Sequence, residues 1–358
     1  MSSASARRVL RPVAASLTRR WAPRSRLLLV GEGAGWSIDH DLRKLGEIAT
    51  KLGIRLADPR FLTLSRDQAA FFGSQFTLLR EPWRPSAHAL GTAYFHGRPG
   101  TPGMPEFDIA YDVLRERHTE LARVQVTHAE MHELVLSTGI EPAKVFRIPI
   151  AVDAGVFTPQ TSGSRAEARR ALGLPADAFV VGSFQKDGVG WDEGTQPKLI
   201  KGPDVLLDAM RRLRERVPEL HLLLSGPARG YVRSGLERLG IPYVHRHIER
   251  YEAIANLYAA LDAYVVPSRQ EGGPKGVLES MAAGVPVVST RVGQAAELIR
   301  DGENGRLVDV GDAEALAAGL AEIGRSTVDA GVATARANTY EAQTPVWRSF
   351  FEGFVTHA

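Results

Sequence analysis

The chain has 358 residues, 44% hydrophobic and 24% charged, a balance that is typical of a globular protein and a length that suits two domains. It contains no cysteine, which excludes disulfide bonds, thiolate metal sites and cysteine nucleophiles and suits a reducing cytoplasm. The formal net charge is +3, and no apolar run approaches the length that crosses a bilayer.

Positive charge is concentrated at the start of the chain. Seven arginines precede the first acidic residue, Glu32, and subtracting seven from the 44 basic residues leaves 37 against 41 acidic ones. The body is therefore slightly acidic, which argues against nucleic-acid binding. Apolar residues recur at helical spacing among these arginines, at Leu10, Val13, Ala14, Leu17 and Trp21. Pro12 interrupts that pattern, so we predict a disordered basic tail at 1–25; peripheral membrane contact and a transit peptide are the alternatives.

The first half of the chain is predicted to alternate strands and helices. Arg26–Val30 indicates a buried strand, Gly31–Ser37 a glycine loop, and Ile38–Leu52 a helix with apolar residues at helical spacing. Further strands are predicted at Ile54–Asp58, Phe76–Leu79, Thr92–His96, Arg123–His128 and Val145–Ile150. Strand, glycine loop and helix form the opening unit of a doubly wound fold.

A Gly-, Ser-, Thr- and Pro-rich linker is predicted at 152–166, and a second series of strands and helices follows it. The predicted strands are Ala178–Phe184, Leu220–Gly226, Ile241–Arg246, Ala263–Ser268 and Val285–Thr290. The predicted helices are Gly202–Val217, Val232–Gly240, Ala253–Asp262 and Glu341–Val355, with a turn region at Asp301–Asp312. This alternation predicts two α/β domains with parallel sheets, whose ligands bind at the carboxyl ends of the strands.

Two glutamates flank a glycine-proline loop in "EGGPKGVLE". Pro274 suits the first position of a helix that ends near Gly284, which leaves Glu271 in the loop and Glu279 in the second turn. The helix start between them favours an anion such as a phosphate. The arrangement therefore suits a diphosphate between two hydroxyl-bearing groups, as in a nucleotide sugar. Alone, the same pair also fits a simple turn followed by a solvated helix residue.

The surrounding sequence resembles a known family. "PSRQEG", "LESMAAGVPVVST" and "VGQAAELIRDGENGRLV" resemble the signature of the family-four retaining glycosyltransferases of the group 1 type, which have the GT-B fold. Together with "KGPDVLLDAM" and "RIPIAVDAGVF", the resemblance covers most of the chain from Val145 to Asp312. It implies an α/β fold of two Rossmann-like, doubly wound parallel-sheet domains that face an interdomain cleft.

The resemblance also implies the domain limits. Residues 26–155 would form the N-terminal, acceptor-side domain, and residues 156–339 the C-terminal domain that binds the nucleotide-sugar donor. A helix within 340–358 would cross back onto the first domain.

Roles for single residues follow from the resemblance. Glu271 is expected to face the donor sugar near the reacting carbon, and Glu279 to bind the ribose hydroxyls. Lys201, at a helix start, is expected to hold the diphosphate, which the amides of Lys275 and Gly276 would also contact. Pro274 has no backbone N–H and stands where the family has a residue with one, so the phosphate contacts here depart from the family pattern.

A second departure concerns the arginine that the family carries just after Gly182. Ser183 stands there, and Lys186 or Lys198 is the candidate replacement for its charge. Both lysines belong to the loop Gln185–Ile200, which is longer than the usual strand-to-helix connection of about 2–6 residues. That length suits either a lid over the donor or a tolerated surface insertion.

The first half contributes further candidates. His96 ends a predicted strand where many family members have a histidine that faces donor and acceptor, and His128 is a weaker candidate after the next strand. Gly33 and Gly35 would let the backbone approach the donor phosphates. A rival interpretation combines Gly31, Gly33 and the acid of the Ile54–Asp58 strand into a dinucleotide site, but the glycine spacing fits poorly.

We therefore predict a metal-independent, retaining hexosyltransferase that needs no cofactor. It would move a sugar from a UDP- or GDP-sugar to a hydroxyl of a sugar, glycan or lipid-linked acceptor, in polysaccharide or glycolipid biosynthesis in the cytoplasm. The base should lie near His245–Glu252. A non-catalytic nucleotide-sugar binder and an NAD-dependent oxidoreductase are the alternatives.

Overall fold

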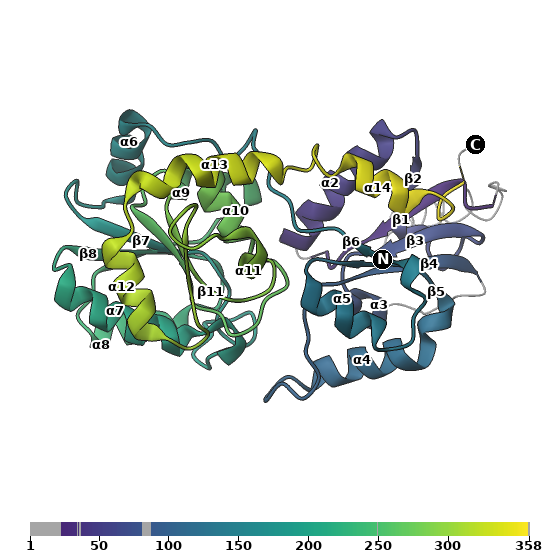
Figure 1. Cartoon of the computed structure of the whole chain (residues 1–358), viewed down its shortest axis with the longest axis horizontal. Coiled ribbons are helices and arrows are strands. Elements are labelled where there is room, and N and C mark those ends of the chain that lie inside the picture. Colours follow the sequence, from purple (N-terminus) through teal and green to yellow (C-terminus); the bar gives the residue numbers. More distant parts are fainter. Residues whose placement is uncertain (1–22, 34, 36, 81–86, 249, 357–358) are drawn as a thin grey trace, which may run out of the picture. The chain divides into compact units, whose positions relative to one another are not determined.

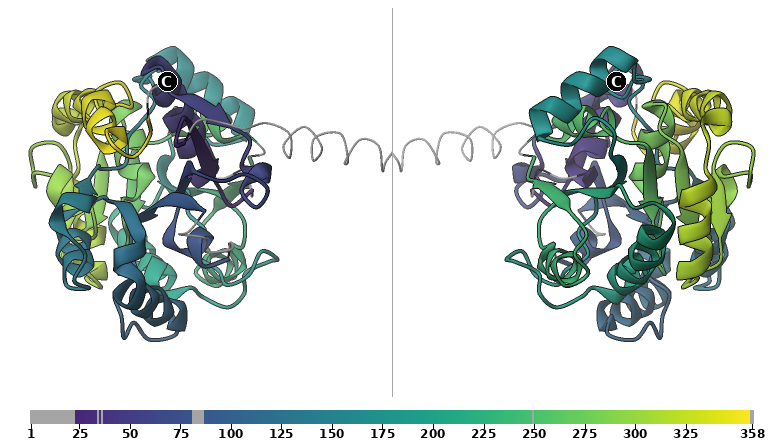
Figure 2. Two further views of the ribbon diagram at one scale, coloured as in Figure 1. Left: turned by 90° about the vertical axis from the view of Figure 1, so that its right-hand side faces the viewer. Right: turned by 90° about the vertical axis from the view of Figure 1, so that its left-hand side faces the viewer.

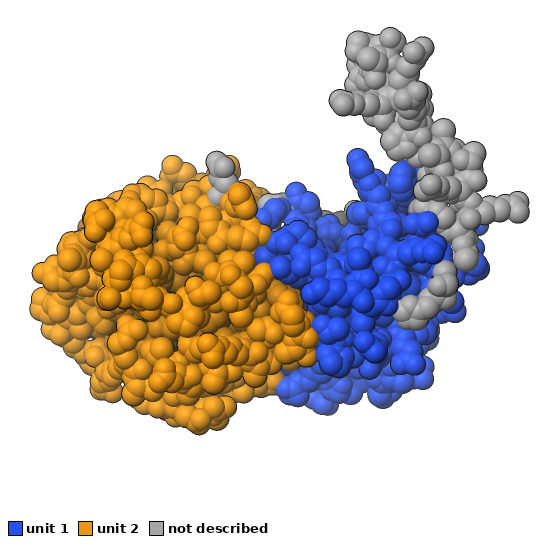
Figure 3. Space-filling view, turned by 90° about the horizontal axis from the view of Figure 1, so that it is seen from above, with its two compact units in different colours: residues 1–148, 343–358 blue, residues 149–342 orange. Residues whose placement is uncertain are grey.

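The computed structural model describes residues 23–33, 35, 37–80, 87–248 and 250–356. The chain forms two compact units, unit 1 of residues 1–148 and 343–358 and unit 2 of residues 149–342 (Figure 3). The limits expected from sequence, after residue 155 and before residue 340, lie a few residues from these. No helix in the described part of the chain is long and apolar enough to cross a membrane.

The predicted basic tail lies outside the described residues except for Pro23, Arg24 and Ser25. These three residues are part of unit 1. The guanidinium of Arg24 donates to the carbonyl of Gly353 at 2.8 Å, and its own carbonyl accepts from the amide of Thr356 at 2.8 Å. Ser25 is buried. The beginning of the described chain is thus bound to its end.

Unit 1 contains a six-stranded parallel sheet in the order β2-β1-β3-β4-β5-β6. Its strands are β1 (Arg26–Val30), β2 (Arg55–Ala57), β3 (Gln68–Phe72), β4 (His88–Tyr94), β5 (Leu121–Val126) and β6 (Val145–Arg147). The strand order reverses between β1 and β3, where Val30 pairs with Phe72. In a doubly wound fold, a ligand binds at the carboxyl ends of the strands at such a reversal.

Helices cover both faces of this sheet (Figures 1 and 2). They are α2 (Ser37–Lys51), α3 (Gln75–Arg80), α4 (Pro105–Arg117), α5 (Ala129–Leu136) and α14 (Thr344–Phe351), with 3₁₀ turns at Pro59–Phe61, His118–Glu120 and Pro142–Lys144. Leu28, Phe72 and Val124 face α3, α4 and α5 in one apolar cluster. On the other face, Phe71 packs edge-on against Trp347 and Phe350 of α14.

The expected strand at Phe76–Leu79 is wrong, because these residues belong to α3. A short apolar run is compatible with either structure, and here a local hydrogen bond decides. The hydroxyl of Ser74 accepts from the amide of Thr77 at 3.1 Å, which is the bond that begins a helix. The missing strand is β3, whose five residues are all buried between β1 and β4.

Unit 2 contains a second six-stranded parallel sheet, in the order β12-β11-β10-β7-β8-β9. Its strands are β7 (Phe179–Ser183), β8 (Leu220–Ser225), β9 (Tyr243–Arg246), β10 (Ala263–Val266), β11 (Val287–Thr290) and β12 (Arg306–Val308). Here the order reverses between β7 and β10. The strand β12 lies inside Asp301–Asp312, which was expected to be only a turn region.

Two helical layers enclose this second sheet (Figures 1 and 2). The helices are α6 (Ser162–Leu172), α7 (Pro203–Arg216), α8 (Gly230–Arg238), α9 (Ala255–Tyr258), α10 (Lys275–Ala282), α11 (Ala295–Leu298), α12 (Ala313–Glu322) and α13 (Val328–Ala337), with 3₁₀ turns at Leu199–Lys201, Tyr251–Ile254 and Arg325–Thr327. One apolar cluster joins α7, α8 and α12 to the sheet, and another joins α9, α10 and α13 to its opposite face.

Two predicted elements of unit 2 differ in extent. The expected linker at 152–166 contains the start of α6, where Thr161 and Ser164 cap the helix reciprocally. The expected helix at Ala253–Asp262 is a 3₁₀ turn followed by the single turn of α9.

Candidate active site

The candidate residues of unit 2 gather where the strand order reverses. Lys201 ends the loop that leaves β7, and Glu271 lies in the loop that leaves β10. Both loops start at strand carboxyl ends, the edge at which doubly wound sheets bind ligands. The topology alone therefore brings two residues 70 positions apart in sequence to one place.

Lys201 and Glu271 form a close ion pair. The Nζ of Lys201 lies 2.7 Å from each carboxylate oxygen of Glu271. Their side chains are 19% and 9% exposed, and the buried Ser268 donates its hydroxyl to Oε1 of Glu271 at 2.9 Å. A carboxylate that is held on two sides keeps a fixed orientation, which a group facing a bound sugar requires.

Backbone contacts join the two loops that carry this pair. The amides of Arg269 and Gln270 both donate to the carbonyl of Ile200, at 2.8 and 3.1 Å. Gly202 has a φ of 63°, and a Cβ there would lie 2.0 Å from the carbonyl oxygen of Pro267. The close approach therefore requires a glycine directly after Lys201.

The helix start beside Glu271 differs by one residue from the prediction. Pro274 has an extended ψ of 105° and precedes the helix, so α10 begins at Lys275. The ammonium of Lys275 donates to the hydroxyl of Tyr340 at 3.1 Å. At Gly276, a Cβ would lie 2.4 Å from the ring of Tyr264, so packing also requires this glycine.

Glu279 lies inside unit 2 and is 4% exposed, so it is not a solvated helix residue. Its Oε2 accepts from the hydroxyl of Tyr258 at 2.8 Å, and its Oε1 accepts from the hydroxyl of Tyr251. These two tyrosines were not among the predicted site residues. Tyr251 does belong to His245–Glu252, the segment expected near the nucleotide base.

Two lysines are the candidates to replace a missing arginine. The Nζ of Lys186 lies 3.7 Å from the ring centroid of Trp191, and the amide of Lys198 donates to the carbonyl of Asp187. Beside Ser183 lies Arg229, whose guanidinium donates to the Ser183 carbonyl at 2.6 Å and to its hydroxyl at 3.1 Å. Nothing in the sequence around Arg229 singles it out.

Arg229 also pairs with Asp187 at 3.0 Å, and both side chains are fully buried. Burial raises the pKa of the Asp187 carboxyl, and the charge of Arg229 opposes that rise. The pair links the start of the loop Gln185–Ile200 to the connection between β8 and α8. The loop is thereby attached to the body of unit 2.

Backbone contacts attach the middle of the same loop to the start of α8. The amides of Gly230 and Tyr231 donate to the carbonyls of Glu193 and Gly194, at 2.6 and 3.0 Å. Within the loop, Val189 is 47% and Trp191 60% exposed. The long loop therefore has a fixed base and an exposed aromatic side chain.

In unit 1, His96 follows β4 at the carboxyl edge of the first sheet. Its ring packs edge-on against Phe107, with 5.3 Å between the centroids, and its carbonyl accepts from the side chain of Gln75. His128 is buried, directly precedes α5, and shares a 2.9 Å hydrogen bond with the hydroxyl of Thr127. Both histidines thus follow strands of the first sheet, His96 half-buried and His128 buried.

The glycine loop after β1 folds around a carboxylate of its own. Oδ1 of Asp39 accepts from the amides of Glu32 and Gly33, at 3.0 and 3.2 Å, and Oδ2 accepts from the amide of Gly35 at 2.7 Å. Gly33 and Gly35 have φ values of 69° and 72°, which favour glycine. Because Asp39 already receives these amides, a phosphate would have to displace it.

The rival dinucleotide interpretation also requires a carboxylate after β2. Asp58 stands there, but it accepts from the amide of Arg60 at 2.9 Å and from the Nε of that residue at 2.8 Å. The hydrogen bond from the Arg60 side chain lowers the pKa of Asp58. This carboxylate therefore stabilises its own turn.

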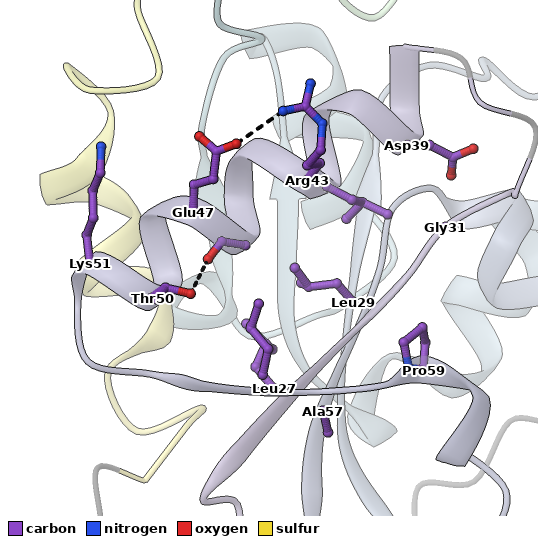
Figure 4. A pocket seen from close by; sticks show the side chains of 13 residues that line it. Leu27, Leu29, Gly31, Asp39, Arg43, Glu47, Thr50, Lys51, Ala57 and Pro59 are labelled. Atoms are coloured by element: carbon purple, nitrogen blue, oxygen red, sulfur yellow. Dashed lines mark hydrogen bonds and ion pairs between the residues drawn. The ribbon is translucent and has the colours of Figure 1, made fainter. Parts of the chain in front are cut away.

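A groove of about 720 Å³ lies between α2 and the edge of the first sheet (Figure 4). Leu27, Leu29 and Ala57 line its strand side, and the ion pair of Arg43 with Glu47 lies on the helix side (Figure 4). Its lining is mainly apolar, as in many small-molecule pockets. Gly31 of the rival dinucleotide interpretation lines it, whereas Lys201, Glu271, Glu279 and His96 do not.

Across the described ranges, no three histidine, aspartate or glutamate side chains lie close enough together to hold a metal ion. The independence from metals that the sequence predicts remains a prediction.

Comparison with known proteins shows that a family model matches the segment of the chain that contains this site. Residues 194–325 match the model of the family described as "Glycosyl transferases group 1". This segment contains Lys201, Glu271, Lys275, Gly276 and Glu279, whereas Lys186 precedes it and His96, Gly33 and Gly35 belong to unit 1.

Curated relatives cover a similar part of the chain. The D-inositol 3-phosphate glycosyltransferase of Actinosynnema mirum is 38% identical over 195 residues, which are 51% of this chain and 44% of that protein. The protein of the same name from Saccharomonospora viridis is 34% identical over 232 residues, 58% of this chain and 51% of that one. The matched part thus spans about half the length of these relatives.

Solved structures match nearly the whole chain in fold. HepE of Anabaena, in complex with UDP and glucose, has a TM-score of 0.70 at 17% identity over 92% of this chain and 99% of its own. Sucrose-phosphate synthase of Thermosynechococcus elongatus has a TM-score of 0.68 at 20% identity over 92% and 100%. The prediction of a GT-B fold with two Rossmann-like, parallel-sheet domains is confirmed.

Proposed function

Because residues 194–325 match the family of group 1 glycosyl transferases, we propose that this chain transfers a sugar from a nucleoside-diphospho-sugar to an acceptor hydroxyl. The observation that carries the proposal is the pairing of Lys201 with both carboxylate oxygens of Glu271, beside the start of α10. A cation, a helix N-terminus and a fixed carboxylate lie together where the fold binds ligands. These groups suit a diphosphate that is linked to a sugar.

Without a donor, Lys201 and Glu271 neutralise each other. A diphosphate carries more negative charge than one carboxylate, so we expect Lys201 to turn toward it when the donor binds. The helix start at Lys275 and Gly276 would stabilise the same charge as it develops on the leaving nucleoside diphosphate. Glu271 then becomes available to accept hydrogen bonds from the sugar, with Ser268 still holding one of its oxygens.

The reaction we propose retains the anomeric configuration and needs no metal. The acceptor oxygen attacks the sugar face that the diphosphate leaves, through an oxocarbenium-like state, and the acceptor proton passes to the departing phosphate oxygen. His96 is the group proposed to orient the acceptor from unit 1. Product NMR would establish the anomer, and activity in EDTA would establish the independence from metals.

Three observations direct the choice of donor and acceptor. HepE was solved with UDP and glucose, which favours UDP-sugars among the donors to be tested first. The curated relatives are named for D-inositol 3-phosphate, which therefore joins saccharide and lipid-linked hydroxyls in the acceptor panel. The arginine-rich start of the chain would suit a lipid-linked acceptor at the inner membrane face.

The decisive experiment is a thermal-shift panel of UDP, GDP, ADP and NAD on the wild type, Lys201→Ala and Arg269→Ala. A ligand at about 100 times its Kd adds roughly 2.7 kcal/mol, so one nucleoside diphosphate should raise Tm clearly. Lys201→Ala should lose most of that ligand-induced rise. Arg269→Ala should keep it, because Arg269 lies in the loop of Glu271 but its guanidinium pairs with Asp204 of α7, and both side chains are partly exposed.

The possible results separate the candidate functions. Stabilisation by NAD alone would contradict the proposal, as would a nucleoside diphosphate that stabilises Lys201→Ala as much as the wild type. Donor binding without turnover on the whole acceptor panel would identify the non-catalytic binder. That outcome has structural support, since Pro274 lacks an amide at the start of α10 and Ser183 carries no charge.

A further inference from the structure

The buried carboxylate of Glu279 has two tyrosine partners in different environments. Tyr258, in α9, is fully buried and packs against Phe184, with 4.9 Å between the ring centroids. Tyr251, in the 3₁₀ turn before α9, is only half-buried. Tyr258 is therefore part of the core, while Tyr251 remains partly exposed.

Tyr258 is more deeply buried than Tyr251. The Tyr258 ring also packs against Phe157 and Tyr264, with centroids 5.7 and 5.3 Å away. Burial raises the pKa of Tyr258 well above its usual value, so its hydroxyl stays protonated and donates to Glu279. Tyr251 packs against Phe157 at 6.2 Å and lies 5.4 Å from the Nζ of Lys275, at the helix start proposed for the diphosphate.

A buried carboxylate needs hydrogen-bond donors, and losing one is costly. In the ligand-free protein Tyr251 supplies the donor to Oε1. A ribose hydroxyl is a donor of the same kind, and Tyr251 is the partner of Glu279 whose side chain is only half-buried. Ribose binding at Glu279 therefore exchanges one donor for another and does not simply add a contact.

We propose that Tyr251 occupies the place of a ribose hydroxyl on Glu279 and is displaced when the nucleotide binds, so that this residue sets the affinity for ribonucleotides. The inference rests on the proposed function, in which Glu279 binds the ribose. Tyr251 acts here as an internal competitor. The binding free energy of a ribonucleotide therefore contains only the difference between two hydrogen bonds to Glu279, its own and that of Tyr251.

Tyr251→Phe removes the competing hydroxyl and keeps the ring. The ligand-free variant then has a carboxylate oxygen without this donor, and a ribose hydroxyl restores it. We expect UDP, or GDP or ADP if the thermal-shift panel selects one of these, to bind about tenfold tighter than to the wild type. The 2′,3′-dideoxy form of the same nucleotide, which cannot donate to Glu279, should bind both proteins equally within a factor of two.

Tyr258→Phe is the matched control, because it removes a hydroxyl from the other oxygen of the same carboxylate. It should lower Tm and leave the nucleotide affinity unchanged or weaker, since Tyr258 is enclosed in the core. Isothermal titration calorimetry on the full chain measures all of these affinities.

Several results would overturn the inference. Affinity for the ribonucleotide that is unchanged or weaker in Tyr251→Phe would do so, as would equal tightening of the ribo and dideoxy forms. Glu279→Gln separates this failure from that of the proposed function. If Glu279→Gln weakens binding of the ribonucleotide while Tyr251→Phe does not tighten it, only the exchange of Tyr251 for a ribose hydroxyl is contradicted. If Glu279→Gln has no effect on binding, the assignment of Glu279 to the ribose is itself contradicted.

Discussion

At the scale of single residues, the charged groups of the candidate site are held by other groups of the protein. Lys201 and Glu271 form an ion pair, and Asp39 accepts hydrogen bonds from the amides of the glycine loop. Two tyrosines donate hydrogen bonds to Glu279. Each arrangement satisfies a buried or partly buried polar group that would otherwise be costly. Ligand affinity at such a site is a difference between two sets of contacts.

The Lys201–Glu271 pair leads to a prediction about stability. Lys201→Ala should lower the stability of unit 2 by about 3 kcal/mol, because it leaves a carboxylate buried without its counter-charge. Arg269→Ala breaks an ion pair whose side chains are 36% and 37% exposed, and should cost less than about 1 kcal/mol. Hydrogen exchange of the β10 and β11 amides measures both effects. Equal losses in the two variants would contradict the burial argument.

At the scale of elements, the loop Gln185–Ile200 shows how a long connection becomes ordered. Two glycines with positive φ lie within it and have different surroundings. A Cβ at Gly194 would lie 2.3 Å from the carbonyl oxygen of Ala228, whereas a Cβ at Gly190 would meet no atom within 4 Å. Their φ values, 68° and 79°, impose similar backbone strain on any other residue.

Gly194→Ala should therefore be more damaging than Gly190→Ala. Both variants carry a left-handed residue at a cost of about 1–2 kcal/mol, and Gly194→Ala adds a backbone clash of about 1–3 kcal/mol. The clash should separate the loop from α8 and expose the amide of Tyr231, which donates to Gly194. Faster hydrogen exchange of that amide in Gly194→Ala, but not in Gly190→Ala, is the expected result. Similar exchange in both would show that the loop does not depend on this contact.

At the scale of the whole molecule, the end of the chain completes the first unit. Phe350 of α14 is fully buried and packs against Phe71 of β3 and Phe146 of β6, with 5.4 and 5.2 Å between the ring centroids. The guanidinium of Arg123 donates to the carbonyls of Phe350 and Glu352, at 3.0 and 2.6 Å. Unit 1 thus acquires part of its core only after unit 2 has been synthesised.

Phe350→Ala should lower the stability of unit 1 by about 3–5 kcal/mol, the usual cost of removing a buried aromatic ring. Unit 2 should keep its own stability, because Phe350 belongs to the other core. Hydrogen exchange should therefore rise in β3 and β4 and remain unchanged in β8. Ser349→Ala, on the exposed side of the same helix, is the control and should change neither unit.

Much of the fold could be predicted because the information is local. Apolar runs predicted β1, β7 and β10, and helical spacing predicted α2 and α7. The run at Phe76–Leu79 fits a strand or a helix equally well, and only the cap at Ser74 distinguishes the two. The strand β3 carries no alternating pattern because all five of its residues are buried.

The sequence alone determined the class of fold and the grouping of Lys201, Glu271, Lys275, Gly276 and Glu279, because these residues lie in a contiguous family segment of characteristic spacing. Only the tertiary structure decided what each of them contacts. Arg229 meets Ser183 across 46 positions, and Tyr251 and Tyr258 meet Glu279 across 28 and 21. Such partners are chosen by the packing of separate elements and by the need of a buried charge for donors, and neither leaves a local pattern in the sequence.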